Sequence, residues 1–545
     1  MGDQAGQRGS LSESAALALG SWRHLNGAAG GRLLCLPAQH LTTHAVIVGM
    51  TGSGKSGLVT VLAEEALSAG IPTVVIDVKG DLPNLLLSFP SFDAKHYQVW
   101  TEMSGDGAGT AAQRAVQLAE QRARSLAAWS ITEEGVSRFA NWTHLRVITP
   151  GSTAGESLHV LSSLERRSPR WDSDIESARA ALSAAVSLLL RLLGRDPDPA
   201  KSKEHVLLSV LAERRLRLGG NAELPALMED LQAPPVQQIG ALPLNSFFKR
   251  TDRLNLAAAL NTLLASPTFA TWRQGAGLDI AAWTQPQNGR TPGVIVSVAH
   301  LDDEERALVL GVVLEEFLSW VRTLPGSQRL RTLLIFDEVY GFIPPHPANP
   351  PTKRPLVALM KQARAFGVGV VVATQNPMDL DYRALSNAGL WAIGRLQTDA
   401  DRARVLDGLS ASLHDGENAG ELERVVPRLA NRWFVVRNAH VPDVGPLLLQ
   451  PRYALSWLRG PMTRSELRLA REQRDRWQNP YSDPSSPDAP TAAAQSSAPE
   501  SPPPPSDGDG NADGTRDGNG NGAGETSHAI PSDDVEPGKP VPVYN

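Results

Sequence analysis

The residues with the clearest chemical signature form a glycine-rich run, Gly49-Met50-Thr51-Gly52-Ser53-Gly54-Lys55-Ser56-Gly57. The run up to Ser56 matches the pattern G-x-x-x-x-G-K-[ST] wherever that pattern fixes a residue. The glycines let the backbone curl so that successive N–H groups face a phosphate. Lys55 is then expected to reach the β- and γ-phosphates, and the Ser56 hydroxyl to ligate Mg²⁺. The sequence therefore predicts that residues 49–57 bind a nucleoside triphosphate.

Two carboxylates end a later apolar run, Leu333-Leu-Ile-Phe-Asp337-Glu338. A phosphate loop needs an acidic partner to bind Mg²⁺, and a hydrolase needs a group that acts on the attacking water. We expect Asp337 to bind the metal through its water shell and Glu338 to polarise the water. The alternative is an ordinary strand that ends in a surface Asp-Glu pair.

Two further polar residues are candidates for contact with the γ-phosphate. Gln375 ends the apolar run 368–374, where it would orient water or sense the phosphate; the alternative is a glutamine that only lines a turn. Arg364 lies just before that run, and its planar donor fork suits a developing phosphoryl charge. A plain surface role for Arg364 stays open, and Arg395 competes with it as the arginine that acts on phosphate.

Parallel strands would bring these residues together. The segments predicted to be buried strands are 44–48, 72–77, 98–100, 145–149, 294–298, 332–337, 368–374 and 391–396. Helices are predicted over 57–67 and 301–324, and a closing hairpin over 432–437 and 444–449. Strands that alternate with helices indicate an α/β fold with a parallel central sheet covered on both faces.

The middle of the chain has a different pattern, because its apolar residues recur at the helical period. We predict six segments: a flexible N-terminus (1–30), the first part of an α/β core (31–171), an all-helical insertion (172–287), the second part of the core with the hairpin (288–461), a C-terminal helix (462–479) and a disordered acidic tail rich in Pro, Gly and Ser (480–545).

The composition limits the classes of protein to which the chain can belong. The chain has 545 residues, of which 41% are hydrophobic, so it can bury a large core. Its formal net charge is −6, and the tail contributes eleven acidic residues against two basic ones. The remainder is therefore slightly basic, which is compatible with nucleic-acid binding through a local patch but is no strong basic footprint.

The cysteine count and the hydropathy pattern indicate the compartment. Cys35 is the only cysteine, so the chain has no intrachain disulfide and no cysteine metal cluster. No apolar run reaches the ~18 residues that a membrane span needs, and the N-terminus has no apolar stretch typical of a signal peptide. We expect a cytoplasmic protein without a membrane partner.

Four segments taken together resemble the HerA–FtsK superfamily of P-loop ATPases: Gly49–Ser56, Asp77-Val-Lys-Gly-Asp81, Leu333–Glu338 and Gln362-Ala-Arg364-Ala-Phe-Gly-(x)7-Gln375. The segment 145–151 also resembles bacterial HerA-like proteins, and the resemblance extends from about Arg32 to Pro461. It implies a RecA-like core that uses ATP and Mg²⁺. It also implies a hexameric ring, with ATP at the subunit interfaces and DNA in the central channel.

The resemblance also implies roles for the site residues. Asp337 and Glu338 are the Walker B pair, and Gln375 is the sensor. Arg364 is the arginine finger, which acts in trans on the nucleotide of a neighbouring subunit. The resemblance gives the acidic residues at 77 and 81 no firm role.

Three features of the relatives are not visible in this sequence. HerA has a β-barrel domain before its phosphate loop, whereas fewer than fifty residues precede Gly49 here. FtsK-type translocases add membrane spans and a winged DNA-reading domain. We expect the ATPase core without these additions.

The function that we favour from the sequence is an ATP-hydrolysing ring motor, a translocase or helicase that moves or remodels double-stranded DNA as a homohexamer. One alternative is a protein-directed ATPase of the secretion or conjugation type, which the near-neutral core charge favours. Another is a nucleotide-gated scaffold whose tail recruits partners, although such a switch does not need Glu338. A protein partner for the tail or the helical insertion stays open.

Overall fold

The computed structural model describes residues 15–478, apart from 105–108, 376, 378–379, 382–384, 386–387 and 411–418. The predicted disordered tail lies outside the described residues. Those up to Arg474 belong to one compact unit, and 475–478, the end of the last helix, belong to a second. The described strands include an eleven-stranded sheet. Its order is β2 (Ala29–Pro37), β1 (Ala16–His24), β15 (Leu447–Pro451), β14 (Phe434–Asn438), β13 (Leu390–Ile393), β3 (Ala45–Val48), β12 (Phe366–Thr374), β11 (Ser327–Asp337), β4 (Thr73–Asp77), β10 (Thr291–Ser297) and β5 (Thr143–Ile148).

The sheet has a parallel part and an antiparallel part. Neighbours from β13 to β5 in the sheet order are all parallel. The strands β14, β15, β1 and β2 continue the sheet with antiparallel pairings, which confirms the predicted hairpin of β14 and β15. Parallel strands place their carboxyl ends at one edge, so the loops that follow them meet there.

The order of the central strands confirms the RecA-like expectation. The strand before the phosphate loop, β3, lies between β12 and β13. The strand that ends at Asp337, β11, is separated from β3 by β12. The residues after β3, β11 and β12 therefore share one edge of the sheet.

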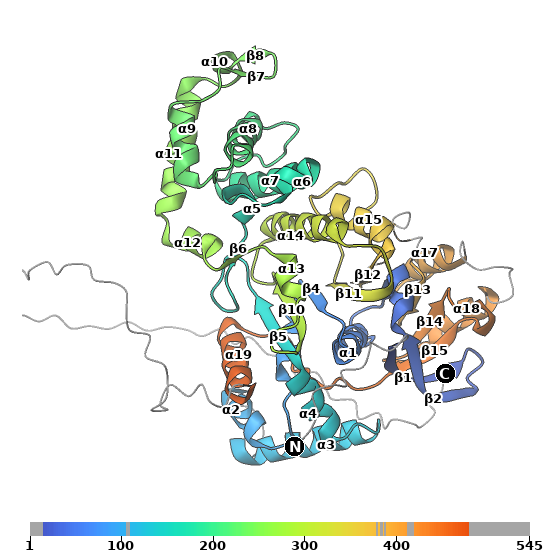
Figure 1. The fold of residues 1–545 in the computed structure, drawn as a ribbon. Helices are drawn as coiled ribbons and strands as arrows, with labels where there is room; N and C mark the ends of the chain where they lie inside the picture. Colours follow the sequence, from blue (N-terminus) through green and yellow to red (C-terminus); the bar gives the residue numbers. More distant parts are fainter. Residues whose placement is uncertain are drawn as a thin grey trace, which may run out of the picture. The chain divides into compact units, whose positions relative to one another are not determined.

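Helices cover both faces of the parallel strands (Figure 1). Alternate side chains of β3 enter different cores: Ile47 belongs to the core that includes α1, whereas Val46 belongs to the core that includes α14. This alternation with continuous burial is typical of a parallel strand covered on both sides. The helices around the sheet are α1 (Lys55–Ser68), α2 (Lys95–Ser104), α3 (Ala111–Ala127), α4 (Glu133–Trp142), α14 (Asp303–Thr323), α15 (Lys353–Gln362), α17 (Asp399–Ser410), α18 (Ala419–Val425) and α19 (Arg464–Gln478).

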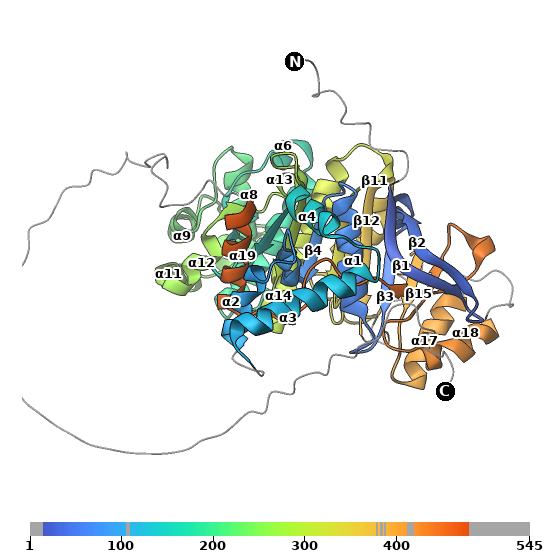
Figure 2. The same ribbon diagram turned by 90° about the horizontal axis from the view of Figure 1, so that it is seen from below.

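The predicted flexible N-terminus (1–30) is wrong over residues 16–24 and 29–30, which belong to β1 and β2. Figure 2 shows these two strands as a continuation of the sheet. Gly20 pairs with Pro451, and a Cβ at Gly20 would lie 2.1 Å from the Gln450 carbonyl oxygen. A small residue is therefore required where β1 passes β15, and the Gly/Ala-rich composition reflects close pairing.

The predicted strand over 98–100 is also wrong. These residues belong to the helix α2, whose buried side chains are His96, Tyr97, Trp100 and Thr101. Their spacing is helical, and Trp100 is fully buried. An apolar run of three residues is too short to distinguish a strand from a helix turn.

The expectation of an all-helical insertion over 172–287 is wrong in part. The segment is mostly helical, but it also contains two-residue strands. The elements from the end of the first core part onward are β6 (Leu158–His159), α5 (Ser162–Glu165), α6 (Arg170–Ser173), α7 (Ile175–Leu192), α8 (Lys203–Arg217), α9 (Leu224–Gln232), β7 (Gln238–Ile239), β8 (Leu242–Pro243), α10 (Leu244–Phe247), α11 (Arg250–Ala265), α12 (Pro267–Arg273), β9 (Ala276–Gly277) and α13 (Ile280–Thr284). Within the described ranges, no helix has the length and apolar character needed to cross a membrane.

Candidate active site

The phosphate loop connects β3 to α1 at the carboxyl edge of the sheet. Gly54 is the N-cap of α1 and has a left-handed φ of 91°. A Cβ at Gly54 would lie 3.0 Å from the side chain of Arg432, so both the backbone angle and the packing favour glycine. The loop therefore enters α1 with the curled backbone that a phosphate site needs.

Backbone hydrogen bonds connect the loop to three neighbouring segments. The Gly49 N–H donates to the Thr374 carbonyl at 3.2 Å, at the end of β12. The Met50 N–H donates to the Arg395 carbonyl at 2.9 Å, just after β13. The Arg432 N–H donates to the Ser53 carbonyl at 2.9 Å. The loop is thus fixed to the strand ends before any ligand binds.

Lys55 and Asp337 form a buried ion pair beneath the loop. The Lys55 Nζ lies 2.5 Å from Asp337 Oδ1, and the two side chains are 3% and 2% exposed. Asp337 Oδ2 is buried and has no hydrogen-bond partner among the described residues. Ser56 is the second residue of α1, directly after Lys55. A hard cation such as Mg²⁺ prefers oxygen ligands, so Asp337 and Ser56 fit the predicted metal role.

Glu338 follows Asp337 in a constrained conformation. Its φ is 61°, a left-handed value that is uncommon for a residue with a side chain. Its Oε1 accepts the Gln375 N–H at 3.2 Å, and its Oε2 lies 2.7 Å from the Lys79 Nζ and 3.7 Å from the Lys55 Nζ. Burial raises the pKa of Glu338, but Lys55 and Lys79 outweigh it, so this pKa lies below its usual value. The carboxylate is therefore charged, as a general base must be.

The side chain of Gln375 connects β12 to the phosphate loop. Its Oε1 accepts a hydrogen bond from the Thr51 hydroxyl at 2.8 Å. The structure thus brings Gln375 together with the loop and with Glu338, as its place at the end of a parallel strand predicts. From there it can contact a γ-phosphate or a water molecule beside it.

Asp77, to which the sequence assigns no role, forms the turn after β4. Its Oδ1 accepts the Gly80 N–H at 3.0 Å, and its Oδ2 accepts the Ser297 hydroxyl at 2.8 Å. Burial raises the pKa of Asp77 to about 6, against the hydrogen bond from Ser297, which lowers it. The turn that Asp77 forms places Lys79 beside Glu338.

Arg364 lies at the opposite edge of the sheet, in the 3-10 turn Ala363–Ala365 before β12. The strand β12 has nine residues, so its two ends are roughly 26 Å apart, and Arg364 and Gln375 lie beyond opposite ends. The structure does not bring Arg364 to the nucleotide site of its own chain.

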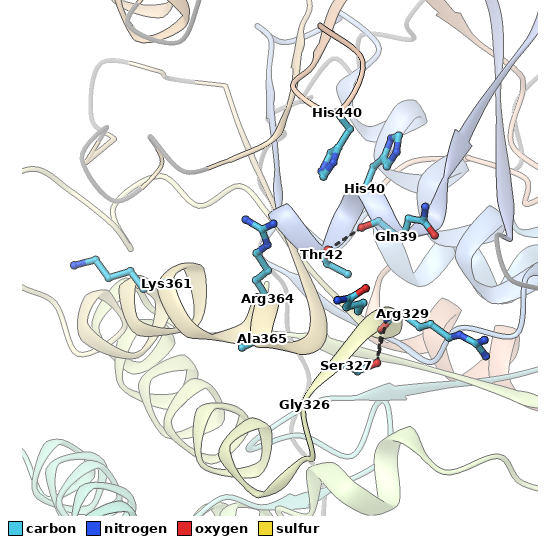
Figure 3. A pocket seen from close by; sticks show the side chains of 11 residues that line it. Gln39, His40, Thr42, Gly326, Ser327, Arg329, Lys361, Arg364, Ala365 and His440 are labelled. Carbon is cyan, nitrogen blue, oxygen red and sulfur yellow. Dashed lines mark hydrogen bonds between the residues drawn. The ribbon is translucent and has the colours of Figure 1, made fainter.

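Arg364 faces a cavity of about 1130 Å³ (Figure 3). The rings of His40 and His440 also point into it and stack on each other, with centroids 4.3 Å apart. Arg329 and Lys361 line the same cavity, and its described lining residues include no Asp or Glu. Burial and the neighbouring positive charge lower the pKa of His440.

Arg395, the competing arginine, lies at the carboxyl edge. Its carbonyl accepts the Met50 N–H, and the residue is exposed just after β13. Arg395 is therefore beside the phosphate loop of its own chain, whereas Arg364 faces away from it.

Sequence reasoning did not identify Lys79 and Arg432 as site residues. Lys79 lies within the Asp77–Asp81 motif, so its position two residues after a strand end was an available signal. Arg432 packs against Gly54, and its guanidinium carbon lies 3.8 Å from the ring centroid of Tyr453. No local pattern in the sequence indicates that Arg432 contacts the phosphate loop, because the two are distant in the sequence.

The first part of the chain is similar to a known protein family. Residues 30–144 match a family model described as Helicase HerA, central domain, which confirms the resemblance over this part of the chain. A search of curated proteins gave no match.

Solved structures with a similar arrangement include VirB4 of Thermoanaerobacter pseudethanolicus, at 12% identity and a TM-score of 0.47, covering 82% of this chain and 98% of that one. Another is the plasmid coupling protein TrwB with a non-hydrolysable ATP analogue, at 16% identity and a TM-score of 0.44, covering 79% of this chain and 90% of that one.

Proposed function

We propose that this P-loop ATPase, which uses ATP and Mg²⁺ and is similar to HerA over residues 30–144, is a ring motor that moves or remodels double-stranded DNA. The observation that carries the ATPase part is the constellation of Lys55, Asp337 and Glu338 at one strand edge. The description of the matching family model as a helicase domain favours DNA as the cargo.

In the proposed reaction the residues of this chain bind ATP and prepare water. Bound Mg²⁺ would neutralise charge on the phosphates. Asp337 and Ser56 would contact the metal, and the Lys55 ammonium would leave Asp337 for the phosphates. Glu338 would accept a proton from the attacking water at a carboxylate oxygen. Gln375 would orient that water.

Arg364 is proposed to act on the nucleotide of a neighbouring subunit. Head-to-tail contacts between identical subunits place different surfaces of the chain against each other and close into rings. Such a contact would bring the amino edge of one sheet, with Arg364, to the carboxyl edge of the next. The lack of Asp and Glu among the described lining residues of the Arg364 cavity supports this, because the triphosphate is anionic.

A protein-directed ATPase of the secretion or conjugation type is the second candidate. The near-neutral balance outside the acidic tail favours it, since DNA motors contact phosphates through basic residues. The helical insertion over 172–287 would then be a candidate surface for a protein partner.

The steady-state ATPase rate with and without linear double-stranded DNA, across a salt series, distinguishes the two candidates. For a DNA motor we expect stimulation by DNA that decreases as salt rises, because salt competes with phosphate contacts. A robust rate that does not respond to DNA at any salt concentration would reject the DNA motor and favour a protein cargo. Heat-denatured protein serves as the blank.

A further inference from the structure

Lys79 occupies a position that the sheet register dictates. Asp77 pairs in register with Asp337 across the parallel strands β4 and β11. The residues that follow the two strands therefore run side by side. Asp77 accepts the Gly80 N–H and so forms the turn in which Lys79 lies. The lysine is thus aimed at the residue after Asp337, which is Glu338.

Protein groups lie against both carboxylate oxygens of Glu338, but within the described part of the chain only Oε1 accepts hydrogen bonds, whereas Oε2 is in an ion pair. Oε1 accepts from the Gln375 N–H, as described above. Oε2 lies 2.7 Å from the Lys79 Nζ, whereas the Lys55 Nζ is 3.7 Å away and contacts Asp337 more closely. Lys79 is therefore the main cation on Oε2. Its side chain is 35% exposed, so it has room to move away.

We infer that Lys79 is a positioning residue that restrains Glu338, and that Mg-ATP in the site releases this restraint only in part. This inference rests on the proposed function, in which Glu338 is the base. The ammonium of Lys79, 2.7 Å from Oε2, stabilises the charged carboxylate and so opposes the transfer of a proton from water to it. The γ-phosphate adds negative charge nearby and competes for the ammonium, so in the ATP-bound enzyme Lys79 is shared between the nucleotide and Glu338, and only part of the base is released.

The step that Lys79 delays is the attack on the γ-phosphate. Water transfers a proton to Glu338 Oε2 while its oxygen bonds to the γ-phosphorus. The bond between the γ-phosphorus and the β–γ bridging oxygen breaks, and ADP leaves with the electron pair. Glu338 then returns the proton to solvent. An ammonium on Oε2 lowers the population of enzyme in which this transfer can occur.

The test compares the basal kcat and the KM for ATP of the wild type with those of Lys79→Met, which keeps the length of the side chain and removes its charge. We expect kcat to rise about 1.5-fold to fivefold, the range for removal of a partly exposed ion pair, while KM changes by a smaller factor. Lys79→Arg keeps a cation and should raise kcat less than half as far. Lys95→Met is the matched control, because Lys95 is exposed and pairs with Asp93 on the surface.

The double variant Lys79→Met with Glu338→Gln shows whether Lys79 acts through Glu338. We expect it to be as slow as Glu338→Gln alone. A kcat for Lys79→Met at or below that of the wild type, in protein with an unchanged unfolding temperature, would overturn the inference. Normal turnover by Glu338→Gln would instead overturn the proposed function. The two failures are therefore distinguishable in one set of assays.

Discussion

The two edges of the parallel sheet differ in how their charges are compensated. At the carboxyl edge, Lys55 and Lys79 each lie against a carboxylate of the same chain. At the amino edge, Arg364 and two further cations face a cavity whose described lining residues include no Asp or Glu. At the first edge the two lysines are paired with carboxylates of the same chain. The second has an excess of positive charge.

This difference has a functional meaning. A ligand must break an ion pair that already exists within its site. The paired groups therefore do not bind the ligand until its charge competes with the pair. A cation cluster without carboxylates is instead ready to receive an anion from outside. We therefore expect substitutions at the carboxyl edge to affect the nucleotide of the same subunit, and substitutions at the amino edge to affect that of a neighbour.

Lys55→Ala should have the largest effect. The substitution removes the ammonium that contacts the phosphates, so we expect loss of ATP binding and no measurable turnover. Binding of a fluorescent ATP analogue and steady-state hydrolysis measure the two effects. Lys361→Ala at the amino edge is the control and should bind the analogue normally. If Lys55→Ala bound the analogue as tightly as the wild type, the carboxyl edge would not be the nucleotide site.

Arg364→Ala should reduce hydrolysis by on the order of 10³-fold or more while ATP binding persists, because an arginine finger stabilises the transition state. Steady-state turnover measures the loss. Arg331→Ala changes an exposed arginine of β11 that does not line the cavity, and it should keep the normal rate.

Mixing two kinds of defective subunit tests whether the two edges act on the nucleotides of different subunits. Subunits with Arg364→Ala keep an intact phosphate loop, and subunits with Lys55→Ala keep an intact Arg364. If Arg364 acts in trans, a mixture should hydrolyse ATP faster than either variant alone. A mixture no faster than its components would mean that Arg364 does not serve a neighbour.

Glu338→Gln should reduce turnover about 10²- to 10⁴-fold, the usual contribution of a general base. Binding of ATP should persist, because Lys55 and the loop are unchanged, and the variant should accumulate as an ATP-bound oligomer. Single-turnover hydrolysis and size-exclusion chromatography with ATP measure both properties. Glu102→Gln, at an exposed position of α2, is the control. Normal turnover by Glu338→Gln would assign the base to another group.

The site residues of the carboxyl edge can be predicted from the sequence because each one is indicated by the residues next to it. Each site residue there follows an apolar run, and parallel strands bring their ends together whatever the loops between them. The positions of Lys55, Asp337, Glu338 and Gln375 follow from this rule alone. Their pairing in the described structure does not, since an ion pair depends on distances that no motif encodes.

The features that escaped prediction depend on distant partners. β1 is a strand because it pairs with β15, more than 400 residues later, and its own composition resembles a flexible segment. Trp100 is buried in a helix by contacts that a three-residue window does not show. Lys79 was visible in its motif, but its contact with Glu338 required the register of β4 against β11.

The smallest predicted effect concerns His44, a buried residue before β3 at the amino edge. Its Nδ1 accepts the Val370 N–H at 3.1 Å, and its φ is 67°. Burial lowers the pKa of His44 from 6.5 to about 4, and the positive charge of Arg364 contributes. Between these values the unfolded chain binds a proton that the folded chain excludes. Stability is therefore lost as the pH falls below about 6.5, and the loss is complete near pH 4.

His44→Asn should remove this pH dependence. Asparagine tolerates a positive φ and places an acceptor oxygen where Nδ1 was, yet it does not titrate. Between pH 7 and pH 5 we expect the wild type to lose about 2 kcal/mol more unfolding free energy than the variant, as measured by urea denaturation. His24→Asn, at an exposed position, should behave as the wild type. If wild type and His44→Asn lost equal stability, the folded chain would bind the proton as readily as the unfolded chain, and burial together with the charge of Arg364 would not lower the pKa of His44.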